Sequence, residues 1–360
     1  MTFRLTPEVH RIGFRDPFRI ARTEESNDSG TATTVIVELR SESMPDLIGY
    51  GEGFPDAYYG ETEETVLAVL PRLLAAVARL GDGLVGPAAD PAGSRAALVQ
   101  ASAAFDAAIS HNGAAKCALD IALHDLVGKR FGLSVHALLG LSADIPPTDF
   151  TIGLDEPAAV AQRAARAASF PALKIKLGGP ADLDTLAAVR AVYDGPIRVD
   201  ANTGWTLEQG KRLLPDLVRF GVELIEQPFV AHRLDDLAAL QAVSPLPIVA
   251  DESAVTIDDL DRLVGVVAGV NVKLAKCGGV GPAARMLARA RELGFRTFLG
   301  CMEETSVGIA ASAAVASLAD WVDLDGNLLL AADPFEGLEL SEDCRWRLSD
   351  RPGLGVSRRV

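Results

Sequence analysis

The chain has 360 residues, of which 49% are hydrophobic, and its formal net charge at pH 7 is −15. This length and composition are typical of a globular protein with an ample aliphatic core, built as two domains or as one domain plus a large barrel. The acidic charge argues against nucleic acid or an anionic membrane as a partner, and no apolar run reaches the ~18 residues of a membrane span.

The first residues, Met1 to Arg4, begin no apolar signal segment. The cysteines are scattered along the chain without a Cys-x-x-Cys motif, and the five histidines show no zinc-site spacing. We therefore expect reduced thiols and a cytoplasmic protein. The cysteines are Cys117, Cys277, Cys301 and Cys344.

Residues 1–130 do not follow a regular repeat, and they predict an α+β domain placed ahead of a barrel. Two antiparallel strands and three helices are expected there. The strands are Thr33–Leu39 and Leu47–Glu52, and the helices are Glu61–Leu80, Ser94–Ile109 and Ala114–Phe131. Two long polar loops, residues 15–30 and 53–60, are predicted to be mobile or functional, because long loops in compact domains usually are.

After Pro146-Pro147, short apolar strands alternate with helices rich in Ala, Leu and Arg. Eight such units predict a (β/α)8-type barrel over residues 146–325, whose chemistry lies at the carboxyl ends of the strands. The expected strands are Phe150–Leu154, Leu173–Leu177, Ile197–Asp200, Glu223–Glu226, Ile248–Asp251, Val270–Leu274, Thr297–Gly300 and Trp321–Asp325. The tail, residues 326–360, has no further unit and is expected to pack back on the first domain.

Ionisable residues close five consecutive strands. Lys176, Asp200, Glu226, Asp251 and Lys273 follow one another at spacings of 22 to 26 residues. Taken singly, each acid is explained as well by a structural role, as a strand-end turn residue or a helix N-cap, as by metal binding. Three acids in register would instead repel one another strongly, and an oxygen-only ligand set suits Mg²⁺. The pattern therefore predicts a magnesium site at the mouth of the barrel.

The lysines flank these acids in chain order, so Lys176 and Lys273 are expected to face each other across the metal. One lysine would remove the α-proton of a bound carboxylate substrate while the metal stabilises the enediolate, and the other would return a proton to the opposite face. This chemistry predicts a racemase or epimerase. Lys174 shares a strand face with Lys176, and repulsion between them is expected to lower at least one lysine pKa. Lys276 is interpreted as a loop charge.

This register resembles the muconate-lactonizing subgroup of the enolase superfamily over nearly the whole chain: Lys-x-Lys, then Asp, Glu, Asp, then Lys. The end of the eighth strand, Asp323-Leu324-Asp325, is similar to the dipeptide epimerases, where the resemblance implies that this pair holds the substrate's ammonium group. An ordinary strand end followed by a turn is the alternative. Residues 300–305, which include Met302 and Glu303, and residues 17–23 also resemble that group.

The preferred side chain stays open at this stage. Arg22 matches a position that contacts the substrate's glutamate in Ala-Glu epimerases, whereas Glu303 stands where those relatives tend to be apolar. Glu303 could favour a cationic side chain or compete for Arg22, together with acids on the two long loops. These loop acids are Glu24, Glu25 and Asp56.

The sequence thus predicts a Mg²⁺-dependent dipeptide epimerase that inverts the α-carbon of the C-terminal residue of an L,L-dipeptide by two-base 1,1-proton transfer. The alternatives within the subgroup are an N-acylamino acid racemase, an o-succinylbenzoate synthase and a cycloisomerase. Outside enzymes, the alternative is a barrel that binds small carboxylates without catalysis. The expected partner is a small dipeptide, and a homo-oligomer is compatible with the sequence.

Overall fold

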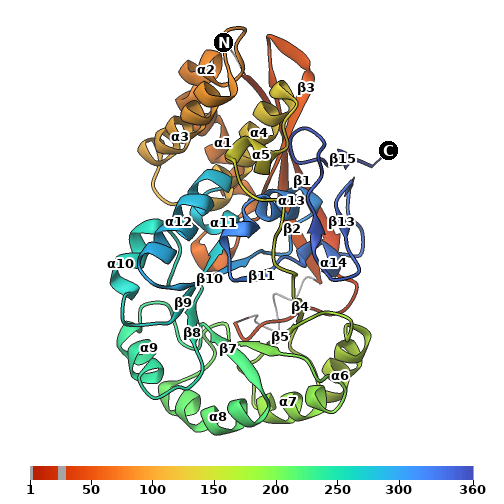
Figure 1. The fold of residues 1–360 in the computed structure, drawn as a ribbon, viewed down its shortest axis with the longest axis vertical. Coiled ribbons are helices and arrows are strands. Elements are labelled where there is room, and N and C mark those ends of the chain that lie inside the picture. Colours follow the sequence, from red (N-terminus) through yellow and green to blue (C-terminus); the bar gives the residue numbers. More distant parts are fainter. Residues whose placement is uncertain (1–2, 23–29, 360) are drawn as a thin grey trace.

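The computed structural model describes residues 3–22 and 30–359. Its N-terminal part holds three antiparallel strands in the order β1-β2-β3, with helices α1 and α4 packed on the sheet (Figure 1). The strands are β1 (Phe3–Gly13), β2 (Thr31–Ser41) and β3 (Met44–Gly53). The helices are α1 (Glu63–Val77), α2 (Gly81–Val85), α3 (Pro91–Ala108), α4 (Gly113–Phe131) and α5 (Val135–Leu139), with 3-10 turns η2 (Ala57–Tyr59) and η3 (Ala78–Leu80).

The predicted pair of strands and the three predicted helices are confirmed, whereas β1 was not predicted. Strand β1 carries mostly exposed or half-buried residues and contains Pro7, so it lacks a clear apolar pattern. Strand β1 forms the edge of the sheet, because its backbone pairs along its whole length with β2. The close approach of α4 to β3 depends on Gly51, where a Cβ would lie 1.9 Å from the carbonyl oxygen of Ala118.

The barrel contains all eight predicted strands, arranged in sequence order from β4 to β11. A parallel bridge between Thr148 and Val322 joins the last strand to the residues just before the first, and this contact closes the ring. The strands are β4 (Phe150–Ile152), β5 (Leu173–Lys176), β6 (Ile197–Asp200), β7 (Val222–Glu226), β8 (Ile248–Ala250), β9 (Gly269–Lys273), β10 (Arg296–Gly300) and β11 (Trp321–Asp323).

Helices α6 to α9 lie on the outside of this ring (Figure 1), and the main hydrophobic core fills the space between strands and helices. The helices are α6 (Pro157–Arg166), α7 (Asp182–Arg190), α8 (Leu207–Arg219), α9 (Leu234–Gln241), α10 (Leu260–Leu263), α11 (Leu274–Cys277), α12 (Val280–Glu292), α13 (Ser306–Ala313) and α14 (Gly326–Leu329), with 3-10 turns η4 (Ile257–Asp259) and η5 (Ala316–Leu318). None of the helices in the described ranges combines the length and apolar character needed to cross a membrane.

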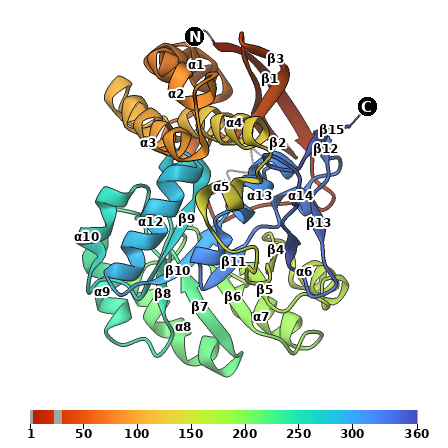
Figure 2. The ribbon, with the colours of Figure 1, turned by 45° about the horizontal axis from the view of Figure 1, so that its top comes forward.

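After α14, the chain forms four short strands: β12 (Phe335–Glu336), β13 (Glu339–Leu340), β14 (Trp346–Arg347) and β15 (Ser357–Arg358). In the view of Figure 2, this dark blue segment lies at the right, beside the barrel and next to the strands of the N-terminal sheet. The ring of Phe335 meets Tyr50 of β3 edge to face, and the backbone N–H of Leu354 donates to Asp125 of α4 at 2.8 Å. The division of the chain near residues 130, 146 and 325 stays a prediction.

Candidate active site

The strand ends of the barrel bring the predicted lysines and acids together. In the register of the sheet, Lys176 lies beside Asp200, and Asp200 lies beside Glu226. Asp251 directly follows β8, and Lys273 ends β9. All five side chains are buried, because the carboxyl ends of parallel strands meet at one mouth of the barrel.

Each lysine is held by one of the acids. The Nζ of Lys176 lies 2.7 Å from Asp200 Oδ2, and on the other side of the mouth the Nζ of Lys273 lies 2.9 Å from Asp251 Oδ2. Both lysines line the same pocket. In the strand order, the strands of these two lysines, β5 and β9, are separated by β6, β7 and β8. The three acids lie at the ends of these intervening strands.

Lys174, the lysine predicted to tune the pKa of Lys176, is buried among three carboxylates. Its Nζ lies 2.8 Å from Glu226 Oε2, 2.8 Å from Asp323 Oδ2 and 3.4 Å from Asp200 Oδ2. Burial by itself would lower the pKa of Lys174, but these three carboxylates raise it well above its ordinary value. The expectation that lysine repulsion lowers the pKa is therefore wrong for Lys174, because the neighbouring acids outweigh the second ammonium group.

The three acids have the chemistry of a hard-cation site. Burial, followed by repulsion from Asp200, raises the pKa of Glu226 to about 7, because these two effects outweigh the ammonium group of Lys174 at 2.8 Å. Within residues 3–22 and 30–359, no three His, Cys, Asp or Glu side chains already stand in metal-binding geometry, and Lys176 and Lys273 are paired with Asp200 and Asp251. Three buried carboxylates at adjacent strand ends nevertheless fit a divalent cation with oxygen ligands.

The acids of the eighth strand form a second cluster. Asp323 ends β11, and Asp325 lies in the turn that starts α14 rather than on the strand as predicted. Thr151 of β4 joins them, because its hydroxyl donates to Asp323 at 2.9 Å and its N–H donates to Asp325 at 2.5 Å. Burial and repulsion from Asp323 raise the pKa of Asp325 well above its ordinary value. A cationic ligand would relieve this repulsion.

Arg22 enters the pocket from the N-terminal domain and is engaged by two acids. Its guanidinium forms an ion pair with the buried carboxylate of Glu252 and a second, of 3.2 Å, with Asp56. The guanidinium carbon lies 4.5 Å from the centre of the Tyr58 ring. The predicted loop of residues 53–60 contains the 3-10 turn η2, and Asp56 is the N-cap of this turn. Glu24 and Glu25 lie outside the described residues.

Met302 and Glu303 follow β10 and line the same pocket as Arg22 and the two lysines. Met302 is buried and Glu303 is partly exposed. Burial raises the pKa of Glu303. The structure thus brings every predicted site residue that it describes to the barrel mouth, although Arg22 is already paired with acids of the protein.

Sequence reasoning missed three polar residues that surround the acids. Lys276 is not a loop charge but a fully buried residue of α11, and its Nζ contacts Asp251 Oδ1 at 2.5 Å. The amide of Asn271 donates to Glu226 at 2.7 Å, and that of Asn202 donates to Glu252 at 3.3 Å. Strand alternation could have indicated Asn271, which stands two residues before Lys273 and so shares its face.

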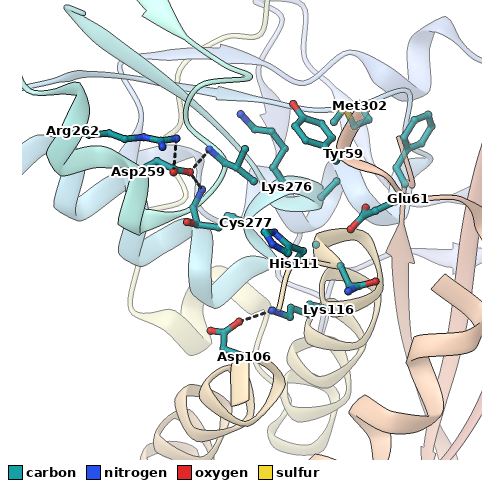
Figure 3. Close-up of a pocket in the computed structure, with 16 residues that line it drawn as sticks. Tyr59, Glu61, Asp106, His111, Lys116, Asp259, Arg262, Lys276, Cys277 and Met302 are labelled. Carbon is teal, nitrogen blue, oxygen red and sulfur yellow. Dashed lines mark hydrogen bonds and ion pairs between the residues drawn. The ribbon is translucent and has the colours of Figure 1, made fainter. Parts of the chain in front are cut away.

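A second cavity, of about 260 Å³, lies between the N-terminal domain and the barrel and touches the active-site pocket at Met302. Figure 3 shows its lining, with side chains from α3 and α4 opposite side chains of α10 and α11. Two ion pairs hold charged groups of this lining: Lys116 with Asp106 and Arg262 with Asp259, each at 2.7 Å.

The sequence also matches known families. Residues 6–140 match the N-terminal domain of the mandelate racemase/muconate lactonizing enzymes, and residues 156–359 match the enolase C-terminal domain-like family. The fold and the site agree with both matches: a three-stranded domain precedes a barrel whose strand ends carry lysines and acids. The chain therefore belongs to the mandelate racemase/muconate lactonizing enzyme family of the enolase superfamily.

Several similar proteins are named as epimerases. An L-Ala-D/L-Glu epimerase of Bacteroides thetaiotaomicron is 37% identical over 334 residues, which cover 91% of this chain and 82% of that protein. An L-Lys-D/L-Arg epimerase of Methylococcus capsulatus is 37% identical over 359 residues, 94% of each chain. The crystal structure of a dipeptide epimerase from Enterococcus faecalis, complexed with Mg and L-Leu-L-Tyr, has a TM-score of 0.84, 31% identity, and coverage of 99% of this chain and 100% of that one.

Proposed function

We propose that this protein is a Mg²⁺-dependent dipeptide epimerase that inverts the α-carbon of the C-terminal residue. The observation that carries the proposal is the placement of two lysine amines in one pocket, Lys176 against Asp200 and Lys273 against Asp251, with Glu226 between them in the strand order. Two bases on either side of one carbon are what a 1,1-proton transfer requires.

Asp200, Glu226 and Asp251 are the residues that would hold the cation, and the raised pKa of Glu226 supports this assignment. Mg²⁺, when bound, supplies a Lewis acid that acidifies the α-hydrogen of a coordinated carboxylate. The residues of the protein position the substrate, keep the site away from bulk water and move one proton at each lysine Nζ.

In this proposal, Asp323 and Asp325 bind the ammonium group of the dipeptide's N-terminal residue. Thr151 orients both carboxylates, and a bound ammonium would compensate the surplus negative charge that raises the pKa of Asp325. One lysine then accepts the α-proton, and the lysine on the other side of the pocket donates a proton to the opposite face. The number of protons on the pair is unchanged by a turnover, and their distribution is restored by a turnover in the opposite direction or by exchange with water.

A named relative supports the dipeptide as substrate, because the E. faecalis structure described above is that of a dipeptide epimerase complexed with the dipeptide L-Leu-L-Tyr. The proteins of B. thetaiotaomicron and M. capsulatus are named L-Ala-D/L-Glu epimerase and L-Lys-D/L-Arg epimerase. The four cysteines are free thiols, which supports a reducing compartment such as the cytoplasm.

The alternative function within the family is that of an enzyme for N-acylated amino acids. Such substrates carry no free ammonium group. Asp323→Asn should therefore strongly reduce the activity of a dipeptide epimerase and leave the activity of an enzyme for N-acylated amino acids in place.

A deuterium-exchange experiment tests the proposal. The protein is incubated with Mg²⁺ and a dipeptide library in D₂O, and mass spectrometry should show a gain of one deuteron in at least one dipeptide. Lys176→Ala and Lys273→Ala should each abolish epimerisation of both diastereomers. Each variant should retain exchange for one epimer only, because the other lysine still faces that hydrogen. Exchange of N-acylamino acids without any exchange of dipeptides would refute the proposed substrate.

A further inference from the structure

The electrostatic balance of the active-site pocket is not explained by catalysis alone. Asp56 and Glu252 form ion pairs with Arg22, and Glu303 lines the same pocket, whereas Asp323 and Asp325 are engaged with Thr151 and Lys174. The charge around Arg22 should therefore influence which substrate side chains this part of the pocket accepts.

Arg22 is not free to receive an anionic side chain. Its guanidinium pairs with Glu252, whose side chain is wholly buried, and with Asp56 at 3.2 Å. The amide of Asn202 also donates to Glu252, at 3.3 Å. Withdrawing Arg22 toward a substrate carboxylate would leave Glu252 buried without its cation, which is strongly unfavourable.

The carboxylate of Glu303 has no partner within the part of the chain that the structure describes. Among residues 3–22 and 30–359, no side chain of another residue forms a hydrogen bond or an ion pair with its carboxylate, although it lines the pocket beside Met302. Lys176, Lys273 and Asp56 are the charged groups that act on it from a distance. Burial raises its pKa, as expected for a carboxylate that has lost water without gaining a cation.

We propose that the pocket selects dipeptides with a cationic side chain and that Glu303 is the carboxylate that receives this side chain. The inference rests on the proposed epimerase function and specifies its substrate class. A lysine or arginine side chain would complete a charge-assisted pair with Glu303. A glutamate side chain would meet Glu303 and Asp56 while Arg22 stays bound to Glu252.

The test compares kcat/KM for epimerisation of four dipeptides by the Mg²⁺-loaded protein: L-Ala-L-Lys, L-Lys-L-Ala, L-Ala-L-Met and L-Ala-L-Glu. At least one lysine dipeptide should exceed L-Ala-L-Glu by about tenfold or more, the effect of one hydrogen bond to a charged group. The two lysine substrates differ in which residue carries the charge, so they identify the residue that Glu303 contacts. This comparison uses the wild-type protein and does not depend on the folding of a variant.

The variant Glu303→Gln should lower the ratio of kcat/KM for the better lysine dipeptide to that for L-Ala-L-Met about tenfold. Glu342→Gln removes the same charge from an exposed position between β13 and β14, and it should leave this ratio at the wild-type value. A preference for L-Ala-L-Glu, or an unchanged ratio in Glu303→Gln, would overturn the inference while leaving the epimerase proposal in place. Absence of exchange with every dipeptide would overturn both.

Discussion

Lys276 shows how one buried side chain can organise a catalytic strand end. Its Nζ donates to the side chain and backbone of Asp251 and to the backbone carbonyls of Ala254 and Asn271, at distances of 2.5 to 3.0 Å. These bonds fix both the carboxylate of Asp251 and the turn that follows β8. Lys276 is therefore a positioning residue for one of the acids that we assign to the metal.

We expect Lys276→Met to lower the free energy of unfolding by about 3 kcal/mol, because it breaks a buried ion pair and leaves the buried carboxylate of Asp251 with Lys273 as its remaining cation. Denaturant unfolding measures this change. Lys211→Met, at an exposed position of α8, is the matched control and should stay within about 0.5 kcal/mol of wild type. A Lys276→Met variant as stable as this control would contradict the assigned role.

At the scale of elements, the junction of α1 and α4 depends on a buried acid. Glu61 lies just before the N-cap of α1, and its carboxylate accepts from the N–H of Ala114, in the first turn of α4, at 3.2 and 3.4 Å. Burial outweighs these bonds and raises the pKa of Glu61 from 4.5 to about 7. The folded protein therefore binds the proton of Glu61 more tightly than the unfolded chain does.

This raised pKa gives a pH dependence with a definite sign. Between pH 4.5 and 7, the folded state carries more protons at Glu61 than the unfolded state, so stability falls as the pH rises through this window. Glu61→Gln removes the titration, and its stability relative to wild type should increase by about 2 kcal/mol from pH 5 to pH 8. Urea unfolding at the two pH values measures the difference.

Glu42→Gln, on the exposed turn between β2 and β3, serves as the control for this experiment and should follow the wild-type pH profile. If the stability of Glu61→Gln relative to wild type is the same at both pH values, burial does not raise the pKa of Glu61 as described.

At the scale of the molecule, buried polar contacts join the N-terminal domain to the barrel. Glu52 of β3 accepts from the N–H and the hydroxyl of Thr305, at 2.9 and 2.6 Å, and from the N–H of Gly308, at 2.8 Å. Arg22 adds its ion pair with Glu252. Because these contacts start next to the active-site strands, occupation of the barrel mouth should stabilise both parts of the protein together.

We therefore expect Mg²⁺ to raise the stability of the whole protein by about 2.7 kcal/mol when its concentration is 100 times its Kd, by mass action on the folded state. Calorimetry with Mg²⁺ and with EDTA measures this shift. Asp251→Asn should abolish most of it, whereas Asp184→Asn, at an exposed position of α7, should retain it. An equal shift in both variants would exclude Asp251 as a ligand.

The sequence by itself determined the features that depend on local spacing. The alternation of side chains along β5 placed Lys174 and Lys176 on one face, and the repeat of strand and helix placed the acids at successive strand ends. These inferences hold because strand geometry and the length of a β/α unit depend on neighbouring residues. The eight strands of the barrel were predictable for the same reason.

Only the tertiary structure decided which distant groups meet. Arg22 pairs with Glu252 across 230 residues of sequence, and Lys174 pairs with Asp323 across 149 residues. No local pattern encodes these partners, so neither the raised pKa of Lys174 nor the engagement of Arg22 could be inferred from the chain. Strand β1 and the closure of the ring between Thr148 and Val322 likewise depend on long-range pairing, which gains its free energy only once the barrel and its neighbouring sheet have formed.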